Sequence, residues 1–186
     1  MVPSDLTDEQ LAAQTQRGDA ESFGSLVNRY ESKLLRYAKK FLLGNEDGRD
    51  LVQEVFLKAY SNINNFDVKR RFSPWLYRIA HNEFINAIKK RSRFPVFSFD
   101  FLDTILPQPV AGERAEDDME KRENRELIDG VLDGLDVKYR EPLILYYIED
   151  LDYHGIAEVL QIPVSTVGVR LSRGKNILKK KLKPHV

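Results

Sequence analysis

Helical periodicity is the feature of this chain that most constrains its fold. In most segments apolar residues recur at spacings of three and four, which places them on one face of an α-helix. We find no convincing segment in which apolar and polar residues alternate, as they do in a half-buried β-strand. The chain has 186 residues, of which 42% are hydrophobic, and this suits one ordinary domain or two small ones. The sequence therefore predicts an all-α globular protein.

Capping signals divide the N-terminal half into four expected helices. Thr7 begins a capping box that opens a short helix, and Asp19 can cap the next one. A third helix is expected over about 46–62. Ser73 as the cap and Pro74 at the first helical position predict a fourth helix that continues to about residue 91.

The helical pattern stops near residue 93. Residues 94–112 contain three prolines and a glycine, which predicts an interdomain linker. We therefore expect two small helical domains, over 1–93 and 113–186. The linker is unusually apolar for a simple tether, so it either packs on a domain or binds a partner.

The C-terminal half carries its own helix signals. Asp136 and Asp152 can each cap a helix, and Pro142 is expected near the first turn of the helix around 139–149. The segment 153–173 has the pattern of a helix, a tight turn and a second helix, with Ser165 as the expected cap of the second.

Composition excludes several classes of function. The chain has no Cys and three scattered His residues, so we expect no disulfide, no metal and no cofactor. A phosphate-binding glycine loop and a nucleophilic cysteine are also missing, which makes an enzyme with a small-molecule substrate the least favoured class. The start lacks a signal peptide, and no apolar stretch approaches the roughly 20 residues of a membrane span. We expect a cytoplasmic protein without membrane insertion.

Basic residues gather in two places, although 29 basic and 29 acidic residues cancel overall. Residues 69–93 hold eight Lys or Arg and one acid, and residues 159–186 hold seven and no acid. Local basic patches, rather than net charge, set the footprint for phosphates. Two such clusters, each attached to a structured motif, favour nucleic-acid binding over a merely solvated surface.

The second helix of the C-terminal hairpin has the composition of a DNA recognition helix. Ser165 and Thr166 at its start suit a phosphate, and Arg170 and Arg173 follow, with Lys175 in the basic continuation. Many two-helix hairpins bind no DNA. The basic tail without acids favours DNA binding here.

Two features of the N-terminal half have both a plain and a functional interpretation. The third expected helix carries a polar stripe of Asp50, Gln53, Glu54 and Leu57, which is either its solvated face or a docking surface. After it come a basic loop and a helix with the groups that bind single-stranded DNA: cations, an aromatic side chain and an amide. The plain interpretation makes Trp75 a core aromatic residue and Asn82 an ordinary surface residue, and the residues alone slightly favour it.

These segments, in this order, resemble regions two and four of bacterial extracytoplasmic-function (ECF) sigma factors. The resemblance rests on D-L-V-Q-E-V-F from Asp50, on W-L-Y-R-I-A-x-N from Trp75, and on I-A-x-x-L-x-I-P-x-x-T-V-x-x-R-L-x-R from Ile156. It extends over nearly the whole chain. It implies a sigma factor that binds core RNA polymerase and directs initiation at particular promoters, and that is not an enzyme.

The resemblance also implies a role for each candidate residue. The clamp helices of the polymerase beta-prime subunit would bind Asp50, Gln53, Glu54 and Leu57. The minus-ten element would be melted and held by Asn62, Lys69, Arg70, Arg71, Trp75, Arg78 and Asn82. The minus-thirty-five element would be read as duplex by Ser165, Thr166, Val169, Arg170, Arg173 and Lys175. Further implied partners are the polymerase beta flap and an anti-sigma factor that holds the free protein inactive.

Several positions depart from the family pattern, among them three in the C-terminal hairpin. Gly168 and Val169 stand where members usually carry a Lys or Arg and then a Ser or Thr, so two expected base-facing positions lack a donor. Gly168 costs the helix up to about 1 kcal/mol relative to Ala, and Val169 could contact a thymine methyl group. Gly155 replaces the acid that is usual in the first helix of the hairpin.

Two other functions fit part of the chain. A plain helix-turn-helix regulator would explain residues 126–186 only, and such regulators normally dimerise, for which we see no surface. A sigma-like protein that titrates polymerase or an anti-sigma factor without initiating is also compatible with the altered recognition helix.

Overall fold

The structure is a computed structural model that describes residues 6–42, 48–91, 130, 132 and 134–182. Every regular element in these residues is helical, which confirms the predicted all-α, two-domain fold. The linker predicted over 94–112 and the start of the helix predicted from 113 lie outside the described residues. The elements are α1 (Asp8–Gln16), α2 (Ala20–Phe41), α3 (Gly48–Ser61), η1 (Ile63–Asn65), α4 (Phe72–Arg91), α6 (Val137–Tyr147), α7 (Tyr153–Leu160) and α8 (Val164–Leu182).

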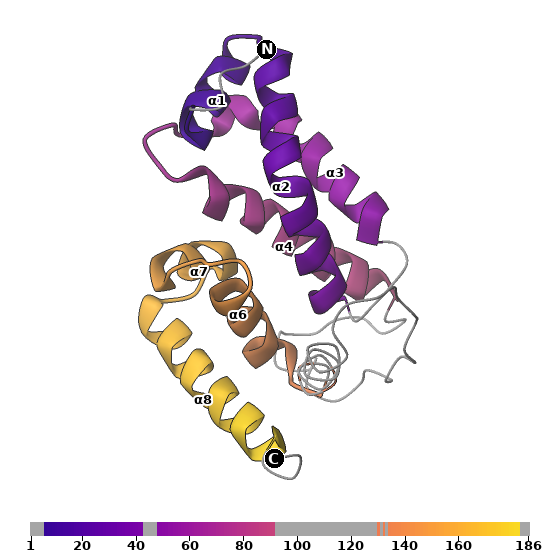
Figure 1. The fold of residues 1–186 in the computed structure, drawn as a ribbon, viewed down its shortest axis with the longest axis vertical. Coiled ribbons are helices and arrows are strands. Elements are labelled where there is room, and N and C mark those ends of the chain that lie inside the picture. Colours follow the sequence, from indigo (N-terminus) through magenta and orange to yellow (C-terminus); the bar gives the residue numbers. More distant parts are fainter. Residues whose placement is uncertain (1–5, 43–47, 92–129, 131, 133, 183–186) are drawn as a thin grey trace, which may run out of the picture.

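Helices α1–α4 form the N-terminal half, and α6–α8 form the C-terminal half (Figure 1). The two halves are packed together: α7 lies against α4, and α6 lies against α2. Helix α8 lies on the outer side of the C-terminal half, away from α1–α4 (Figure 1). None of the described helices has the length and apolar character needed to cross a bilayer.

Helix α2 buries the face that its periodicity predicts. Asp19 caps it, because the Asp19 carboxylate accepts from the N–H groups of Glu21 and Ser22, and the capping box of Thr7 with Gln10 opens α1 as predicted. Apolar residues at spacings of three and four along α2 are buried in the core, namely Phe23, Leu26, Tyr30, Leu34, Ala38 and Phe41. Tyr37, three residues after Leu34 and four before Phe41, follows the same spacing and is fully buried as well.

Helix α4 buries a wider face than its periodicity predicts. Leu76, Ala80 and Phe84 follow at spacings of four and are buried, and Ile85, which shares another side of the helix with Trp75 and Asn82, is buried as well at 5% exposure. Helix α4 packs on α3 and α1 in the N-terminal half and also on α7 of the C-terminal half. A helix with neighbours on more than one side buries more than one stripe.

Two predicted helix starts are wrong by two positions. Helix α4 begins at Phe72, so Ser73 lies inside the first turn rather than at the cap. The free Phe72 N–H donates instead to Glu9 Oε1 of α1 at 3.0 Å. Helix α8 begins at Val164, so Ser165 also lies in the first turn and does not cap the helix. The first N–H groups of a helix have no acceptor within that helix, so the tertiary structure around the helix start determines which group accepts from them.

The C-terminal half depends on two aspartate caps and one close helix crossing. Asp136 accepts from Lys138 N–H at 3.0 Å, and Asp152 accepts from Gly155 N–H at 2.7 Å, as predicted. Pro142 is the sixth residue of α6 rather than part of its first turn. At the crossing of α6 and α8, a Cβ on Gly174 would lie only 2.8 Å from Leu143 Cδ1.

Candidate interfaces for polymerase and DNA

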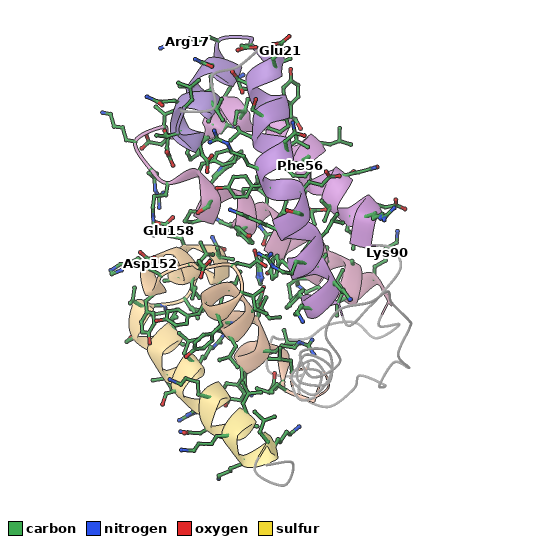
Figure 2. The ribbon with its side chains drawn as sticks, viewed as in Figure 1. Arg17, Glu21, Phe56, Lys90, Asp152 and Glu158 are labelled. Atoms are coloured by element: carbon green, nitrogen blue, oxygen red, sulfur yellow. The ribbon has the colours of Figure 1, made fainter. Side chains whose placement is uncertain are left out.

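The polar stripe of α3 borders an apolar groove. Asp50, Gln53, Glu54 and Leu57 are all exposed, and Leu57 is 65% exposed. Beside them a groove of about 1010 Å³ lies between α2 and α3, with Phe56 at its side (Figure 2). The groove is lined mainly by Phe23, Val27, Leu35, Val52, Phe56, Leu57 and Tyr60. An exposed apolar groove next to a polar stripe is typical of a docking surface rather than of a solvated helix face.

The basic loop and the start of α4 bring four of the expected minus-ten residues together. Arg70, Arg71, Trp75 and Arg78 line one cavity of about 400 Å³. Trp75 is half-buried and packs on Phe66, with ring centroids 5.1 Å apart. The plain interpretation of Trp75 is therefore partly right, because the indole belongs to an aromatic cluster, yet one of its sides lines the cavity.

The remaining three residues of this group do not line that cavity. Asn82 is exposed and follows Trp75 and Arg78 along α4 at spacings of three and four, so the three share one side of the helix. Lys69 is exposed in the loop. Asn62 lies at the end of α3, where its amide donates to Lys58 O at 2.8 Å, and it does not line the cavity.

Five of the six expected minus-thirty-five residues share one side of α8. Ser165, Val169 and Arg173 follow at spacings of four and are exposed, and Thr166 and Arg170 are half-buried beside them. Lys175 comes two residues after Arg173, so it lies about 200° further around the helix. A Cβ on Gly168 would lie 3.6 Å from the ring of Tyr153, so this position is turned toward α7.

Sequence reasoning missed an exposed aromatic group beside α8. Tyr146 packs on Tyr147 and on Tyr153, with ring centroids 4.8 and 5.5 Å apart. All three rings are exposed. They come from the end of α6 and the start of α7, and no periodic pattern in the sequence links them.

Comparison with known proteins identifies the family. Residues 26–94 match Sigma-70 region 2, and residues 125–178 match Sigma-70, region 4. The ECF RNA polymerase sigma factor SigW of Bacillus subtilis is 35% identical over 175 residues, which cover 91% of this chain and 94% of SigW. The chain belongs to the ECF sigma factors.

Solved structures agree with this assignment. The structure of CnrH in complex with the cytosolic domain of CnrY superposes with a TM-score of 0.73 at 26% identity, over 96% of this sigma factor and 99% of CnrH. The sigma factor RpoE of Bartonella quintana, solved in complex with the anti-sigma factor NepR, has the same fold. Its TM-score is 0.72 at 24% identity, over 88% of this chain and 98% of that one. The predicted family and its role in promoter recognition and transcription initiation are confirmed. A plain regulator would leave the region 2 match unexplained.

The three arginines that line the α4 cavity of this sigma factor already have partners on α7 and at its two ends. Arg70 Nη2 lies 2.8 Å from Glu158 Oε1, and Arg71 Nη2 lies 2.7 Å from Asp152 Oδ1. The Arg71 guanidinium and the Gly155 N–H lower the pKa of Asp152 below its usual value. Gln161, with its amide oxygen turned toward Arg78, accepts from Arg78 Nε at 3.1 Å.

Two buried carboxyl groups of α6 and the residues after it also bind the N-terminal half. Glu149 Oε1 accepts from Arg36 Nε at 2.9 Å, and Glu149 Oε2 accepts from the Tyr77 hydroxyl at 2.5 Å. Glu141 Oε1 accepts from the Tyr37 hydroxyl at 2.5 Å.

His81 joins the Glu141 pair, because its Nδ1 lies 2.6 Å from the same Glu141 oxygen. Burial, together with the neighbouring carboxyl groups, raises the pKa of both tyrosines, Tyr37 and Tyr77, so both hydroxyls remain protonated donors. No sequence pattern predicts this cluster, since its members are far apart in the chain.

Proposed function

We propose that this sigma factor binds core RNA polymerase through α3, reads the minus-ten element with α4 and the loop before it, and reads the minus-thirty-five element with α8. One observation carries the proposal. The region 2 and region 4 matches fall on the two halves that present three separate faces, each with the chemistry of one of these tasks. Acting on polymerase and chromosomal DNA would place the protein in the cytoplasm.

The polymerase-binding face consists of Asp50, Gln53, Glu54 and Leu57 and the adjacent groove. The exposed apolar surface of Leu57 and the groove supports binding of a helical partner, because helices commonly lay an apolar face into such a groove. We assign this face to the clamp helices of the beta-prime subunit. The beta flap is the expected contact of the C-terminal half.

The minus-ten face combines three kinds of contact with a single strand. Lys69, Arg70, Arg71 and Arg78 would hold phosphates, and the open side of Trp75 would stack on or wedge against a base. The exposed amide of Asn82 can pair with a base edge. Asn62 lies outside the cavity and would contact the strand only beyond it.

The minus-thirty-five face is the outer side of α8. The first turn carries the hydroxyls of Ser165 and Thr166, which suit a phosphate. Arg170 and Arg173 can donate to guanine in the major groove, and Val169, which is 48% exposed, can contact a thymine methyl group. Lys175 lies on another side of the helix and would contact the phosphate backbone of the DNA.

We further propose that a dedicated anti-sigma factor binds the free protein. The groove between α2 and α3 is apolar and exposed in the free protein, where no polymerase covers it. Exposed apolar surfaces of this kind mark sites of protein–protein binding, which supports a second partner. If the protein from its native host is never found with such a partner, and its abundance alone sets its activity, this part of the proposal fails.

Run-off transcription tests the proposal as a whole. Bacterial core polymerase, with and without this protein, is given sheared DNA from the source organism, and the transcripts are mapped by sequencing. Discrete start sites that need the protein are expected, and they would yield both promoter elements. Binding to core polymerase without new start sites would favour a titrating protein instead. Failure to bind core polymerase would leave only a plain DNA-binding regulator.

A further inference from the structure

The first part of the loop that leads into α4 is bound by the last residue of α1. The side-chain amide of Gln16 donates to Ile63 O and to Phe66 O, both at 2.8 Å. A primary amide nitrogen carries two hydrogens, so these two bonds use its whole donor capacity. Phe66 follows η1 with an extended backbone, so its carbonyl oxygen needs a donor from outside the turn, and Gln16 supplies it.

The same side of α1 also binds the end of this loop. Glu9 Oε1 accepts from the Phe72 N–H at 3.0 Å. Glu9 and Gln16 are seven residues apart in α1, so they share one side of the helix and are separated by roughly 10 Å along its axis. Helix α1 also contacts both η1 and α4, which lie before and after the loop (Figure 1). The loop is therefore attached to one helix at both of its ends.

The middle of the loop is closed by its own hydrogen bonds. Asp67 O accepts from the Arg70 N–H at 2.9 Å, and Asp67 Oδ1 accepts from the Lys69 N–H at 3.0 Å. Lys69 and Arg70 are both exposed on this turn. The hydrogen bonds of Asp67, together with those from α1, fix the backbone from which these cations project.

The two phenylalanines whose backbone α1 binds are also the rings on which Trp75 packs. The ring centroid of Trp75 lies 5.1 Å from that of Phe66 and 5.5 Å from that of Phe72. The two phenylalanine rings meet edge to face at 5.4 Å, and both side chains are buried. Closely packed side chains transmit displacements to their neighbours. A shift of the loop backbone at Phe66 or Phe72 would therefore move the indole of Trp75.

We propose that α1 positions Trp75 for the minus-ten element, with Gln16 and Glu9 as the positioning residues. Gln16 fixes the start of the loop at Phe66, Glu9 fixes its end at Phe72, and the two rings hold the indole. Neither positioning residue needs to touch DNA. Because the indole and the loop are in place before a strand arrives, binding of the strand loses less conformational entropy. The inference rests on the proposed function for the role of Trp75 in strand binding, but not for the positioning itself.

The test replaces the donor of Gln16 and leaves the rest of the helix unchanged. Gln16→Glu keeps the size and nearly the helix propensity of the side chain, but an ionised carboxylate has no hydrogen to donate. Gln10→Glu is the matched control on the same helix. It adds the same charge but keeps the side-chain oxygen that accepts from the Thr7 N–H at 2.8 Å in the capping box.

Trp75 is the only tryptophan of the chain, so its fluorescence reports its surroundings without a label. We expect Gln16→Glu to shift the emission to longer wavelength and to increase quenching by acrylamide, because the displaced indole becomes more accessible to water. Gln10→Glu should change neither. Circular dichroism checks that the variants keep their helices. Should Gln16→Glu unfold the N-terminal half, Gln16→Ala, which removes the donor without adding a charge, takes its place.

Open-complex formation then tests what the positioning serves. Core polymerase is combined with each variant on a promoter mapped with the parent protein, and permanganate reactivity of melted thymines is measured. Gln16→Glu should reduce the reactive fraction by about fivefold or more, as expected for the loss of one base stacked on an aromatic ring. Gln10→Glu should match the parent protein.

Three results would overturn the proposal. Unchanged Trp75 fluorescence in both Gln16 variants would mean that α1 does not position the indole. A displaced indole with undiminished open complexes would mean that the positioning does not serve the minus-ten element. An equal response of Gln10→Glu would assign the effect to added charge on α1. If the parent protein gave no start sites, the proposed function would fail instead, and the fluorescence would still test the positioning.

Discussion

Two glycines of α8 have opposite surroundings, although both lie inside the same helix. Gly168 has room for a methyl group, since its Cβ would lie 3.6 Å from a ring atom of Tyr153. At Gly174 the Cβ would lie 2.8 Å from Leu143 Cδ1 and 3.3 Å from the backbone oxygen of Tyr139. Leu143 is itself 2% exposed and cannot easily move aside. At the residue scale, packing and not helix propensity decides which glycine is needed.

Alanine at these positions should therefore change stability in opposite directions. Gly168→Ala should raise the free energy of unfolding by up to about 1 kcal/mol, which is the helix preference of Ala over Gly. Gly174→Ala should lower it, because overpacking a core costs roughly 1–3 kcal/mol and exceeds that gain. Urea denaturation followed by circular dichroism measures both. A stabilising effect of Gly174→Ala would show that α6 and α8 are not in the close contact described.

At the element scale, helix ends in this protein are stabilised both from within and from outside. Asp19, Asp136 and Asp152 each cap the helix that follows them directly. The start of α4 is different, because its first N–H donates to Glu9 on α1, 63 residues earlier in the chain. The fourth helix thus depends on the first for its cap.

Removal of this remote cap should destabilise the N-terminal half. Glu9→Ala is expected to lower the free energy of unfolding by about 1 kcal/mol, the usual cost of losing an N-cap side chain. Glu9→Gln keeps an oxygen acceptor and should lose clearly less. Urea denaturation measures the free energy of unfolding of both variants, and the difference between them reports the hydrogen bond to the Phe72 N–H. Equal losses of stability in the two variants would argue against the Glu9 cap.

Asp152 serves two partners at the start of α7, and this makes its contribution depend on pH. Its folded pKa is lowered from 3.8, first by Arg71 and then by the Gly155 N–H. The contribution is therefore complete above pH 3.8 and is lost as the pH falls through the lower folded value. Thermal melts of the parent and of Asp152→Asn between pH 6 and 2.5 should differ at the upper end and converge at the lower end. A constant difference across this range would contradict the role of the carboxylate.

At the scale of the whole molecule, the two halves are in direct contact, although the DNA-binding faces that we propose lie on different halves. Glu141 and Glu149 join them through Tyr37, Tyr77 and Arg36, while the proposed reading faces lie on different helices. Val169 on α8 is 48% exposed, whereas Arg70 and Arg71 before α4 pair with Glu158 and Asp152, so the two proposed DNA-binding faces have different surroundings.

Substitutions on the two faces should separate these steps. Asn82→Ala is expected to reduce open-complex formation by about 1–3 kcal/mol, the value of one base contact, and to leave duplex binding by the C-terminal half unchanged. Arg173→Ala should weaken duplex binding first. Permanganate reactivity of melted thymines and duplex gel shifts, on a promoter mapped by run-off transcription, measure the two steps. Equal loss in both assays for Asn82→Ala would contradict the division of tasks.

Much of this protein could be predicted because the relevant interactions are short in sequence. The periodic face of α2, the caps at Thr7, Asp19 and Asp152, and the hairpin of α7 and α8 involve residues three or four positions apart. The order of the region 2 and region 4 motifs was equally visible, and with it the family. A pattern in the chain reports such neighbours directly, since helix geometry brings them together.

Other features exist only where remote segments meet. Tyr37 and Glu141 are 104 residues apart in the chain, and Tyr77 and Glu149 are 72 apart. Burial of these groups, the close approach of α7 to Pro74 at Gly155 and the pairing of Arg70 and Arg71 with Glu158 and Asp152 all follow from how the halves pack. No spacing rule in a single sequence encodes a contact whose partners lie on different helices of different halves. Local periodicity thus determined the helices and the candidate faces, whereas tertiary packing decided which of their side chains are exposed and which are paired with the other half, because those contacts join residues remote in the chain.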